Sequence, residues 1–224
     1  MNIAIDGPAG AGKSTIAKLV SAKLGFIYVD TGAMFRAVAY NCTKNGIDKE
    51  NTDAISEASS KADISIKYVG NVQRVFLNDE DVTDHLRDEA VGNMASVVAQ
   101  IPAVRSNLLD LQRKLAREND VVMDGRDIGT CVLPDAELKI YLTASSAVRA
   151  KRRYDELTAK GETPDLDVIE KDIIERDERD MNREIAPLKQ AEDAVLVDSS
   201  YMTIDEVSAR IISLAEEAGA GAGD

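Results

Sequence analysis

Short apolar runs recur along this chain, and stretches with the spacing of helices separate them. The runs occupy residues 2–6, 26–29, 121–123, 138–142 and 194–197. Continuous apolar runs of this length, bounded by turn residues, are typical of strands buried on both faces of a parallel sheet. The pattern therefore predicts an α/β fold in which a five-stranded parallel sheet is flanked by helices.

The helical stretches lie between and after these runs. Residues 13–24 and 103–117 carry apolar side chains at helical spacing. Thr203 and Glu206 have the spacing of a capping box, which predicts a last helix that begins there and ends near residue 215. The tail that follows, with the sequence AGAGAGD, is expected to fray.

Two segments depart from this alternation of apolar runs and helical stretches. Residues 63–84 alternate apolar and polar positions on both sides of Gly70-Asn71, which predicts a small antiparallel hairpin attached to the α/β core. Residues 149–183 contain 9 basic and 11 acidic side chains, which is too polar for helices of a core. This segment is predicted to be a mobile helical arm.

The composition excludes several classes of protein. The 27 Lys and Arg against 40 Asp and Glu give a formal charge of −13, which argues against nucleic-acid polymers and anionic membranes as partners. The longest stretch without a charge, residues 90–104, is shorter than a transmembrane helix requires. The N-terminus lacks the pattern of a secretion signal, and Cys42 and Cys131 are isolated. We expect a cytoplasmic protein with no disulfide and no zinc site.

A phosphate-binding loop follows the first apolar run. The pattern G-x-x-x-x-G-K-[ST] lets backbone N–H groups surround phosphate oxygens, while its Lys reaches the β- and γ-phosphates and its hydroxyl binds Mg²⁺. The alternative is a glycine-rich turn with an incidental Lys. The residues expected to bind ATP are Gly7, Pro8, Ala9, Gly10, Ala11, Gly12, Lys13, Ser14 and Thr15.

Candidate catalytic residues also follow the predicted strand at residues 121–123. Asp124 closes the apolar run at 121–123, and a carboxylate there can hold Mg²⁺ through water. Arg126 follows two residues later and suits an enzyme that grips a second phosphate. The guanine-selecting pattern N-K-x-D is absent from the sequence, which argues against a GTPase. The alternative is a strand-end turn with a local Asp–Arg pair.

Further arginines could complete the site. Arg36 lies shortly after the second predicted strand, at the carboxyl edge of the sheet. Arg176, Asp180 and Arg183 have the spacing i, i+4, i+7, which puts them on one face of a helix, with Arg179 beside them. Without the phosphate loop, a surface arginine and a solvated helix with its own ion pairs would explain these residues.

The motifs and their order resemble the bacterial cytidylate kinases, a family of nucleoside monophosphate kinases. The resemblance extends over almost the full length and is carried by GPAGAGKST, DTGAMFR, MASVVAQIPAVR, DGRDIGT, PDAELKIYL, RAKRR, ERDERDMNREIAPL and VLVDSS. It implies a monomer with a P-loop core, a monophosphate-binding domain and a short lid. The core would comprise residues 1–35, 106–148 and 185–224, the monophosphate-binding domain residues 36–105, and the lid residues 149–184.

The resemblance also implies roles for individual residues. The acceptor phosphate would contact Arg36, Arg126 and Arg183. The sugar hydroxyls would face Asp180 and Arg176, and the base would be read by Ser96, Arg105 and Asp127. Further CMP contacts are expected from Asp30, Thr31, Gly32 and Gly125, and adenine contacts from Arg149 and Arg153. The expected catalytic residues are Lys13, Asp124, Arg126 and Arg183, and the expected metal ligands are Ser14 and Asp124.

The implied reaction is the transfer of a phosphoryl group from ATP to CMP or dCMP with Mg²⁺. A carboxylate can accept a hydrogen bond from the exocyclic amino group of cytosine, whereas uracil presents a carbonyl oxygen at that position. The alternatives are a P-loop kinase for UMP, dTMP or a non-nucleotide acceptor, and a nucleotide-binding module without turnover.

Overall fold

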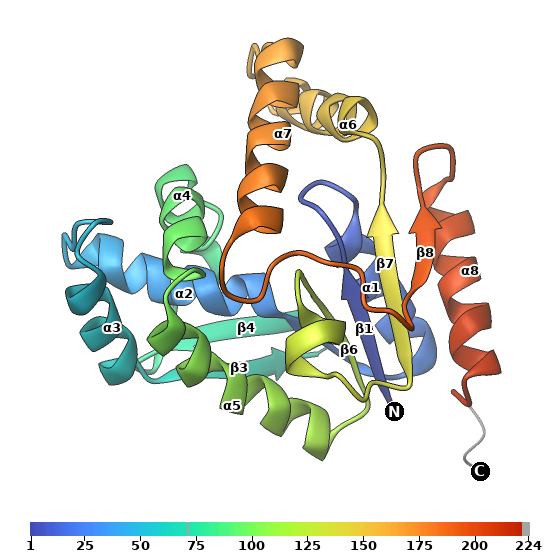
Figure 1. The fold of residues 1–224 in the computed structure, drawn as a ribbon, viewed down its shortest axis with the longest axis horizontal. Coiled ribbons are helices and arrows are strands. Elements are labelled where there is room, and N and C mark those ends of the chain that lie inside the picture. The colour runs from blue at the N-terminus through green and yellow to red at the C-terminus, as the bar shows by residue number, and fades with distance from the viewer. Residues whose placement is uncertain (71, 221–224) are drawn as a thin grey trace. The chain divides into compact units, whose positions relative to one another are not determined.

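The computed structural model describes residues 1–70 and 72–220 (Figure 1). The chain divides into two compact units, which are described separately below. The first unit comprises Met1–Phe26 and Asp120–Asp224, and the second comprises Ile27–Asn119.

A five-stranded sheet confirms the predicted fold class. Its strand order is β2-β6-β1-β7-β8, and the pairs β1–β6, β1–β7 and β7–β8 are parallel. Each predicted apolar run forms one of these strands, with ends within two residues of the prediction. The bounds are β1 Asn2–Asp6, β2 Ile27–Asp30, β6 Val121–Gly125, β7 Leu138–Thr143 and β8 Val195–Asp198.

Helices of the first unit follow the ends of its strands. Helices α1 and α8 pack against each other and against strands of the sheet, while α6 packs against α7. The short π-helix η2 follows β6 and was not expected from the sequence. The bounds are α1 Lys13–Leu24, η2 Ile128–Val132, α6 Ser146–Ala159, α7 Leu166–Asn182 and α8 Ile204–Glu217.

The capping box at the start of α8 is confirmed. The Thr203 hydroxyl accepts a hydrogen bond from the Glu206 N–H at 3.2 Å, and the Glu206 carboxylate accepts one from the Thr203 N–H at 2.8 Å. At the other end, the Ala220 N–H donates to the carbonyl of Ala215, so the first three tail residues form a turn rather than a frayed end. The rest of the predicted frayed tail, residues 221–224, lies outside the described residues.

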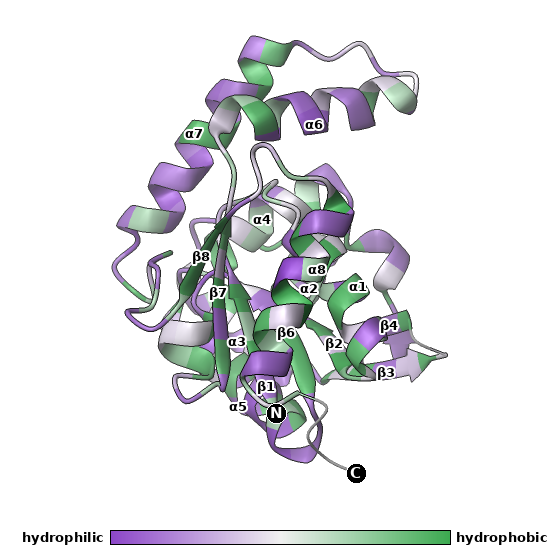
Figure 2. Ribbon diagram, turned by 90° about the vertical axis from the view of Figure 1, so that its right-hand side faces the viewer, coloured by the Kyte–Doolittle hydropathy of each residue, from purple (hydrophilic) through white to green (hydrophobic). Residues whose placement is uncertain are grey.

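The predicted helical arm consists of α6 and α7. Figure 2 shows hydrophilic stretches along both helices, as expected for a segment rich in charge. Helix α7 ends at Asn182, and Arg183 has extended backbone angles of φ −64° and ψ 141°. The prediction that Arg183 shares a helical face with Arg176 and Asp180 is therefore wrong. The chain turns back at this point, since the Leu188 N–H donates to the Asp180 carbonyl at 2.8 Å.

The second unit contains the remaining helices and a small antiparallel sheet. The predicted hairpin is confirmed, with Ile64 opposite Leu77 and Ile66 opposite Val75. A third strand, β5, was not predicted, and Asn71 of the predicted turn lies outside the described residues. The bounds are α2 Thr31–Lys44, α3 Thr52–Lys61, β3 Ile64–Val69, β4 Val72–Leu77, β5 Glu80–Asp81, η1 Thr83–His85, α4 Glu89–Val98 and α5 Pro102–Glu118.

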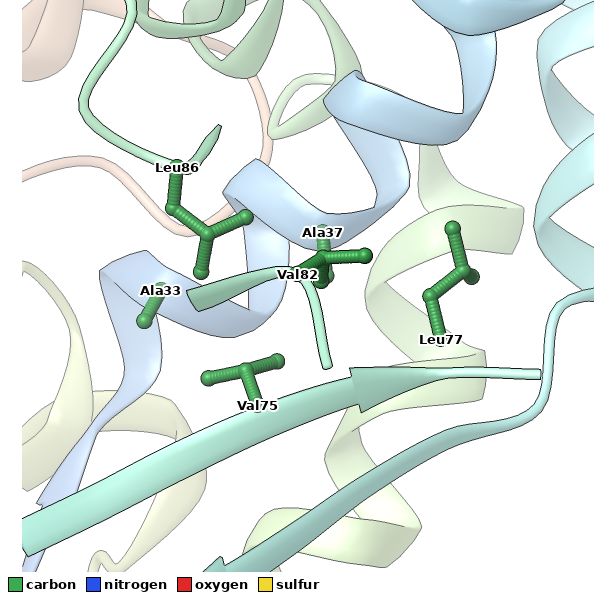
Figure 3. Packing of buried hydrophobic residues seen from close by; sticks show 6 residues of the cluster. All are labelled: Ala33, Ala37, Val75, Leu77, Val82 and Leu86. Carbon is green, nitrogen blue, oxygen red and sulfur yellow. The ribbon is translucent and has the colours of Figure 1, made fainter. Parts of the chain in front are cut away.

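A buried apolar cluster holds this small sheet against α2. Figure 3 shows Ala33 and Ala37 of α2 on the side of the helix that faces Val75 of β4. Because both α2 residues are alanines, the strand can approach the helix closely. The other members of the cluster are Leu77, Val82 and Leu86.

Within the described residues, none of the helices combines the length and the apolar character needed to cross a bilayer.

Candidate active site

The loop between β1 and α1 has the backbone of a phosphate-binding loop. Gly7 has φ +147°, and a Cβ at this position would lie 1.9 Å from the carbonyl oxygen of Leu142 in β7. Gly12, which precedes the first residue of α1, has φ +92°. Both conformations are accessible to glycine and strained for other residues. The predicted arrangement of strand, loop and helix is confirmed.

Lys13 spans this loop. Its ammonium donates to the carbonyl of Pro8 at 2.8 Å, and the side chain is buried. Burial lowers the pKa of Lys13 well below its usual value, and the positive charge of Arg126 lowers it further. The nearby carboxylates of Asp124, Asp6 and Asp180 act in the opposite direction. An anion bound in the loop would stabilise the protonated form, because an opposite charge favours the charged ammonium.

The two predicted metal ligands lie together. The Ser14 hydroxyl donates to the buried carboxylate of Asp124 at 2.9 Å. Mg²⁺ prefers such oxygen ligands and usually keeps several waters and substrate phosphates as further ligands. Across the described ranges, 1–70 and 72–220, no group of three or more His, Cys, Asp or Glu side chains could hold a metal. A cation here would therefore depend on this pair together with phosphate and water.

Two ion pairs connect the turn after β6 with the end of α7. The Arg126 guanidinium donates to the Asp180 carboxylate at 2.9 Å. Arg183 donates to the Asp127 carboxylate at 3.1 Å, and both side chains are only 6% exposed. The structure thus brings together four predicted CMP-binding residues from sequence segments that are far apart. Gly125, which ends β6, precedes this turn directly.

Arg149 connects the phosphate loop to both helices of the arm. Its guanidinium donates to the Ala144 carbonyl at 2.9 Å, to the Ala9 carbonyl at 2.9 Å and to the Asp177 carboxylate at 2.6 Å. Arg153, the other candidate for adenine, is exposed and donates to Glu156 of its own helix at 2.8 Å. The two arginines lie four positions apart on α6 but have different partners, and their contacts with adenine stay predictions.

Arg176 lies one helical turn before Asp180 on α7 and is half-buried. Arg179 is exposed, and its Nε donates to the backbone carbonyl of Glu175 at 3.2 Å.

The second unit holds the remaining predicted site residues. Asp30 caps α2 by accepting the Ala33 N–H at 2.9 Å. The guanidinium of Arg105 lies 5.4 Å from the centroid of the Phe35 ring, a cation–π contact, and donates to the Ala99 carbonyl at 3.2 Å. The other members are Thr31, Gly32 and Arg36 on α2 and Ser96 on α4.

Asp6 and Asp177 were missed by the sequence analysis. The Asp6 carboxylate accepts the N–H groups of Ile128 at 2.8 Å and Gly129 at 2.7 Å, and burial raises its pKa to about 6 although these bonds act to lower it. Its position at the end of a strand, beside the phosphate loop, was a usable signal. Asp177 carried no such signal among the many charges of α7.

Comparisons with known proteins show similarity along almost the whole chain. The family model described as "Cytidylate kinase" matches residues 3–217. The cytidylate kinase of Leuconostoc mesenteroides is 51% identical over 214 residues, with 96% of each chain covered. That of Listeria innocua is 54% identical over 215 residues, with the same coverage. In the solved structure of an uncharacterized protein from Eubacterium ventriosum, the fold is similar, with a TM-score of 0.54, 12% identity, and 96% and 98% of the two chains covered.

Proposed function

Because this chain belongs to the cytidylate kinase family, we propose that it transfers the γ-phosphoryl group of ATP to CMP or dCMP, giving ADP and CDP or dCDP. One observation carries the proposal beyond the family match. The phosphate-binding loop follows β1, and the Arg126–Asp127 turn follows β6, which is the parallel neighbour of β1. A site with these two parts on adjacent strands suits two phosphorylated substrates.

The donor phosphates would bind in the loop of residues 7–14. Backbone N–H groups and Lys13 would surround the β- and γ-phosphates, and the positive end of α1 would add to the attraction. Ser14 and Asp124 would hold Mg²⁺ when it is bound, and the ion would neutralise charge on the transferred group. The acceptor phosphate is already ionised at pH 7, so the chain needs no strong general base.

The acceptor phosphate would bind to Arg126 and Arg183, with Arg36 as a further ligand. The first two arginines pair with carboxylates at 2.9 and 3.1 Å. A phosphate can replace a carboxylate on a guanidinium with similar bidentate geometry. Because these groups are already withdrawn from water, binding the phosphate would cost less desolvation than at an exposed arginine. Asp180 and Arg176 would then face the sugar hydroxyls.

The base would be read by Asp127, Ser96 and Arg105. A carboxylate accepts from the exocyclic amino group of cytosine, and the hydroxyl and guanidinium donate to its ring nitrogen and carbonyl. With uracil, buried groups of the site would stay unpaired, so CMP would be preferred.

The division into domains belongs to this proposal. Residues 36–105 would act as the monophosphate-binding domain, residues 149–184 as the lid, and the remainder as the core. We further propose a cytoplasmic monomer that has neither nucleic-acid polymers nor membranes as partners, which the charge of −13 supports.

The test is an assay of ADP formation by the purified protein with Mg-ATP and a panel of CMP, dCMP, UMP, AMP and dTMP. We expect fast turnover with CMP or dCMP. Fast turnover with another acceptor and slow turnover with both cytidine nucleotides would contradict the substrate assignment. Tight binding of ATP and CMP without transfer would favour a non-catalytic nucleotide-binding module.

A further inference from the structure

Asp6 makes two hydrogen bonds that join distant parts of the first unit. Its carboxylate, at the end of β1, accepts the backbone N–H groups of Ile128 and Gly129 at 2.8 and 2.7 Å. The side chain is 5% exposed, so water cannot easily replace either partner. A Cβ on Gly129 would lie 3.1 Å from the side chain of Lys139 and 3.4 Å from the Asp6 Oδ2, so the glycine is packed closely between these two side chains.

These N–H groups are the first two of the π-helix η2, whose N-cap position is held by Asp127. Aspartate is among the most favoured N-cap residues, because its carboxylate usually accepts N–H groups of the first helical turn. Asp127 makes no such cap bond. Its carboxylate is directed to Arg183 instead. Asp6, on the neighbouring strand β1, thus accepts the N–H groups that an N-cap aspartate such as Asp127 usually accepts in its own helix.

We propose that Asp6 is a positioning residue that caps η2 from β1 and thereby leaves the Asp127 carboxylate available to recognise the cytosine base. The part of this inference that concerns the cytosine base rests on the proposed function. Asp6 acts only through Asp127 and does not touch the substrate. Its negative charge also opposes an inward turn of Asp127, because two carboxylates close together repel each other.

Removal of the Asp6 carboxylate leaves two buried N–H groups without an acceptor. Such groups are costly, and Asp127 is the acceptor that the helix geometry places next to them. In Asp6→Ala, Asp127 should therefore turn to cap η2 and leave Arg183. Recognition of the base is then lost although Asp127 itself is still present.

The first arm of the test compares acceptor selectivity. Initial rates with CMP and UMP at saturating Mg-ATP give kcat/KM for the wild type, Asp6→Ala, Asp127→Ala and the double variant. We expect Asp6→Ala to lower the ratio of CMP to UMP by about tenfold or more, mainly through KM for CMP, the size of a lost hydrogen bond to a charged group. The double variant should lose little more than Asp127→Ala alone, since both changes remove the same interaction.

Two controls separate positioning from loss of structure. Asp193→Asn removes an exposed carboxylate that pairs with Lys139, and it should leave the ratio unchanged. Asp6→Asn keeps the shape and one carbonyl acceptor, so it covers the case in which Asp6→Ala does not fold, and it should lower the ratio to an intermediate value. An Asp6 variant that slows CMP and UMP equally would show a merely structural role and overturn the proposal.

The second arm does not depend on activity. A crystal structure of Asp6→Ala, or of Asp6→Asn, should show the Asp127 carboxylate bonded to the N–H of Ile128 or Gly129. A carboxylate that stays on Arg183 would overturn the capping role. A wild type without preference for CMP, combined with a turned Asp127 in the variant, would contradict the proposed function and leave the capping role supported.

Discussion

Burial acts in opposite directions on the two ionisable residues that flank the phosphate loop. It raises the pKa of Asp6 to about 6 and lowers that of Lys13 well below its usual value, because a buried site disfavours the charged form of either group. Asp6 receives two backbone N–H groups in compensation, and Lys13 receives the carbonyl of Pro8. The positive charge of Lys13 is thus poorly solvated, which increases its attraction to a bound phosphate.

The raised pKa of Asp6 predicts a dependence of stability on pH. In the unfolded chain the carboxyl releases its proton near pH 3.8, whereas in the folded protein it keeps the proton up to about pH 6. The stability contributed by Asp6 is therefore fully present below pH 3.8 and is lost as the pH rises to 6. Relative to Asp6→Asn, the wild type should lose roughly 3 kcal/mol of unfolding free energy across this window. Urea unfolding of both proteins at several pH values measures the difference, and parallel curves would contradict the prediction.

The loop has no room for a side chain at Gly7, so we expect that a substitution there disrupts it. In Gly7→Ala, the new methyl group would lie 1.9 Å from the Leu142 carbonyl oxygen at a φ of +147°. We expect a lower melting temperature and the loss of ATP binding, measured by thermal unfolding and by a fluorescent ATP analogue. Gly92 in α4 is a matched control, because a Cβ there would meet nothing within 4 Å. Gly92→Ala should stabilise the protein by up to about 1 kcal/mol, as is usual for a helix interior.

At the scale of elements, the hydropathy pattern predicted those strands and helices that are determined by the burial and spacing of apolar residues. All five apolar runs form strands, and α1 occupies the predicted residues 13–24. The π-helix η2 could not be predicted, because its first N–H groups are satisfied by Asp6 from another strand. The end of α7 was missed for a related reason. The run of charged residues continues through Arg183 and gives no sign that the helix ends before it. In the structure the backbone is extended at Arg183, whose side chain pairs with Asp127.

The candidate site was predictable to a similar degree. The loop motif identified Lys13 and Ser14, and the strand end identified Asp124, because each lies next to a recognisable apolar run. Spacing along the chain could not predict which arginine pairs with which carboxylate. Arg126–Asp180 and Arg149–Asp177 each join two segments whose proximity only the fold establishes.

The buried pair of Arg149 and Asp177 predicts how firmly α7 is attached to α6. The two side chains are 6% and 12% exposed and lie 2.6 Å apart. Asp177→Ala leaves a buried guanidinium without its counter-charge, and we expect a loss of about 3 kcal/mol in unfolding free energy. Glu156→Ala, which removes two exposed pairs on α6, with Arg153 and Lys160, should cost less than about 1 kcal/mol. Chemical denaturation of both variants tests the contrast, and equal losses would contradict it.

Over the whole molecule, the net charge of −13 coexists with a site rich in arginine. Because cations gather around the phosphate loop, the remaining surface is more acidic than the net charge suggests. At low salt we expect no binding of a fluorescent DNA duplex, whereas a fluorescent ATP analogue should bind and should be displaced by ATP. Fluorescence anisotropy measures both ligands. DNA binding that weakens steeply with salt would contradict this view of the surface.

The pairing of β1 also constrains the order in which the chain can fold during synthesis. Asn2 lies opposite Val121 and Ile3 opposite Leu138, so β1 leaves the ribosome long before either of its partner strands has been made. The unit Ile27–Asn119 is continuous in sequence and is completed during that delay. Because a contact between distant residues requires the closure of a long loop, the pairing of β1 is a slow step. The phosphate-binding loop, which begins at the end of β1, is thus made before β6 and β7 but can take its shape only after they have joined the sheet.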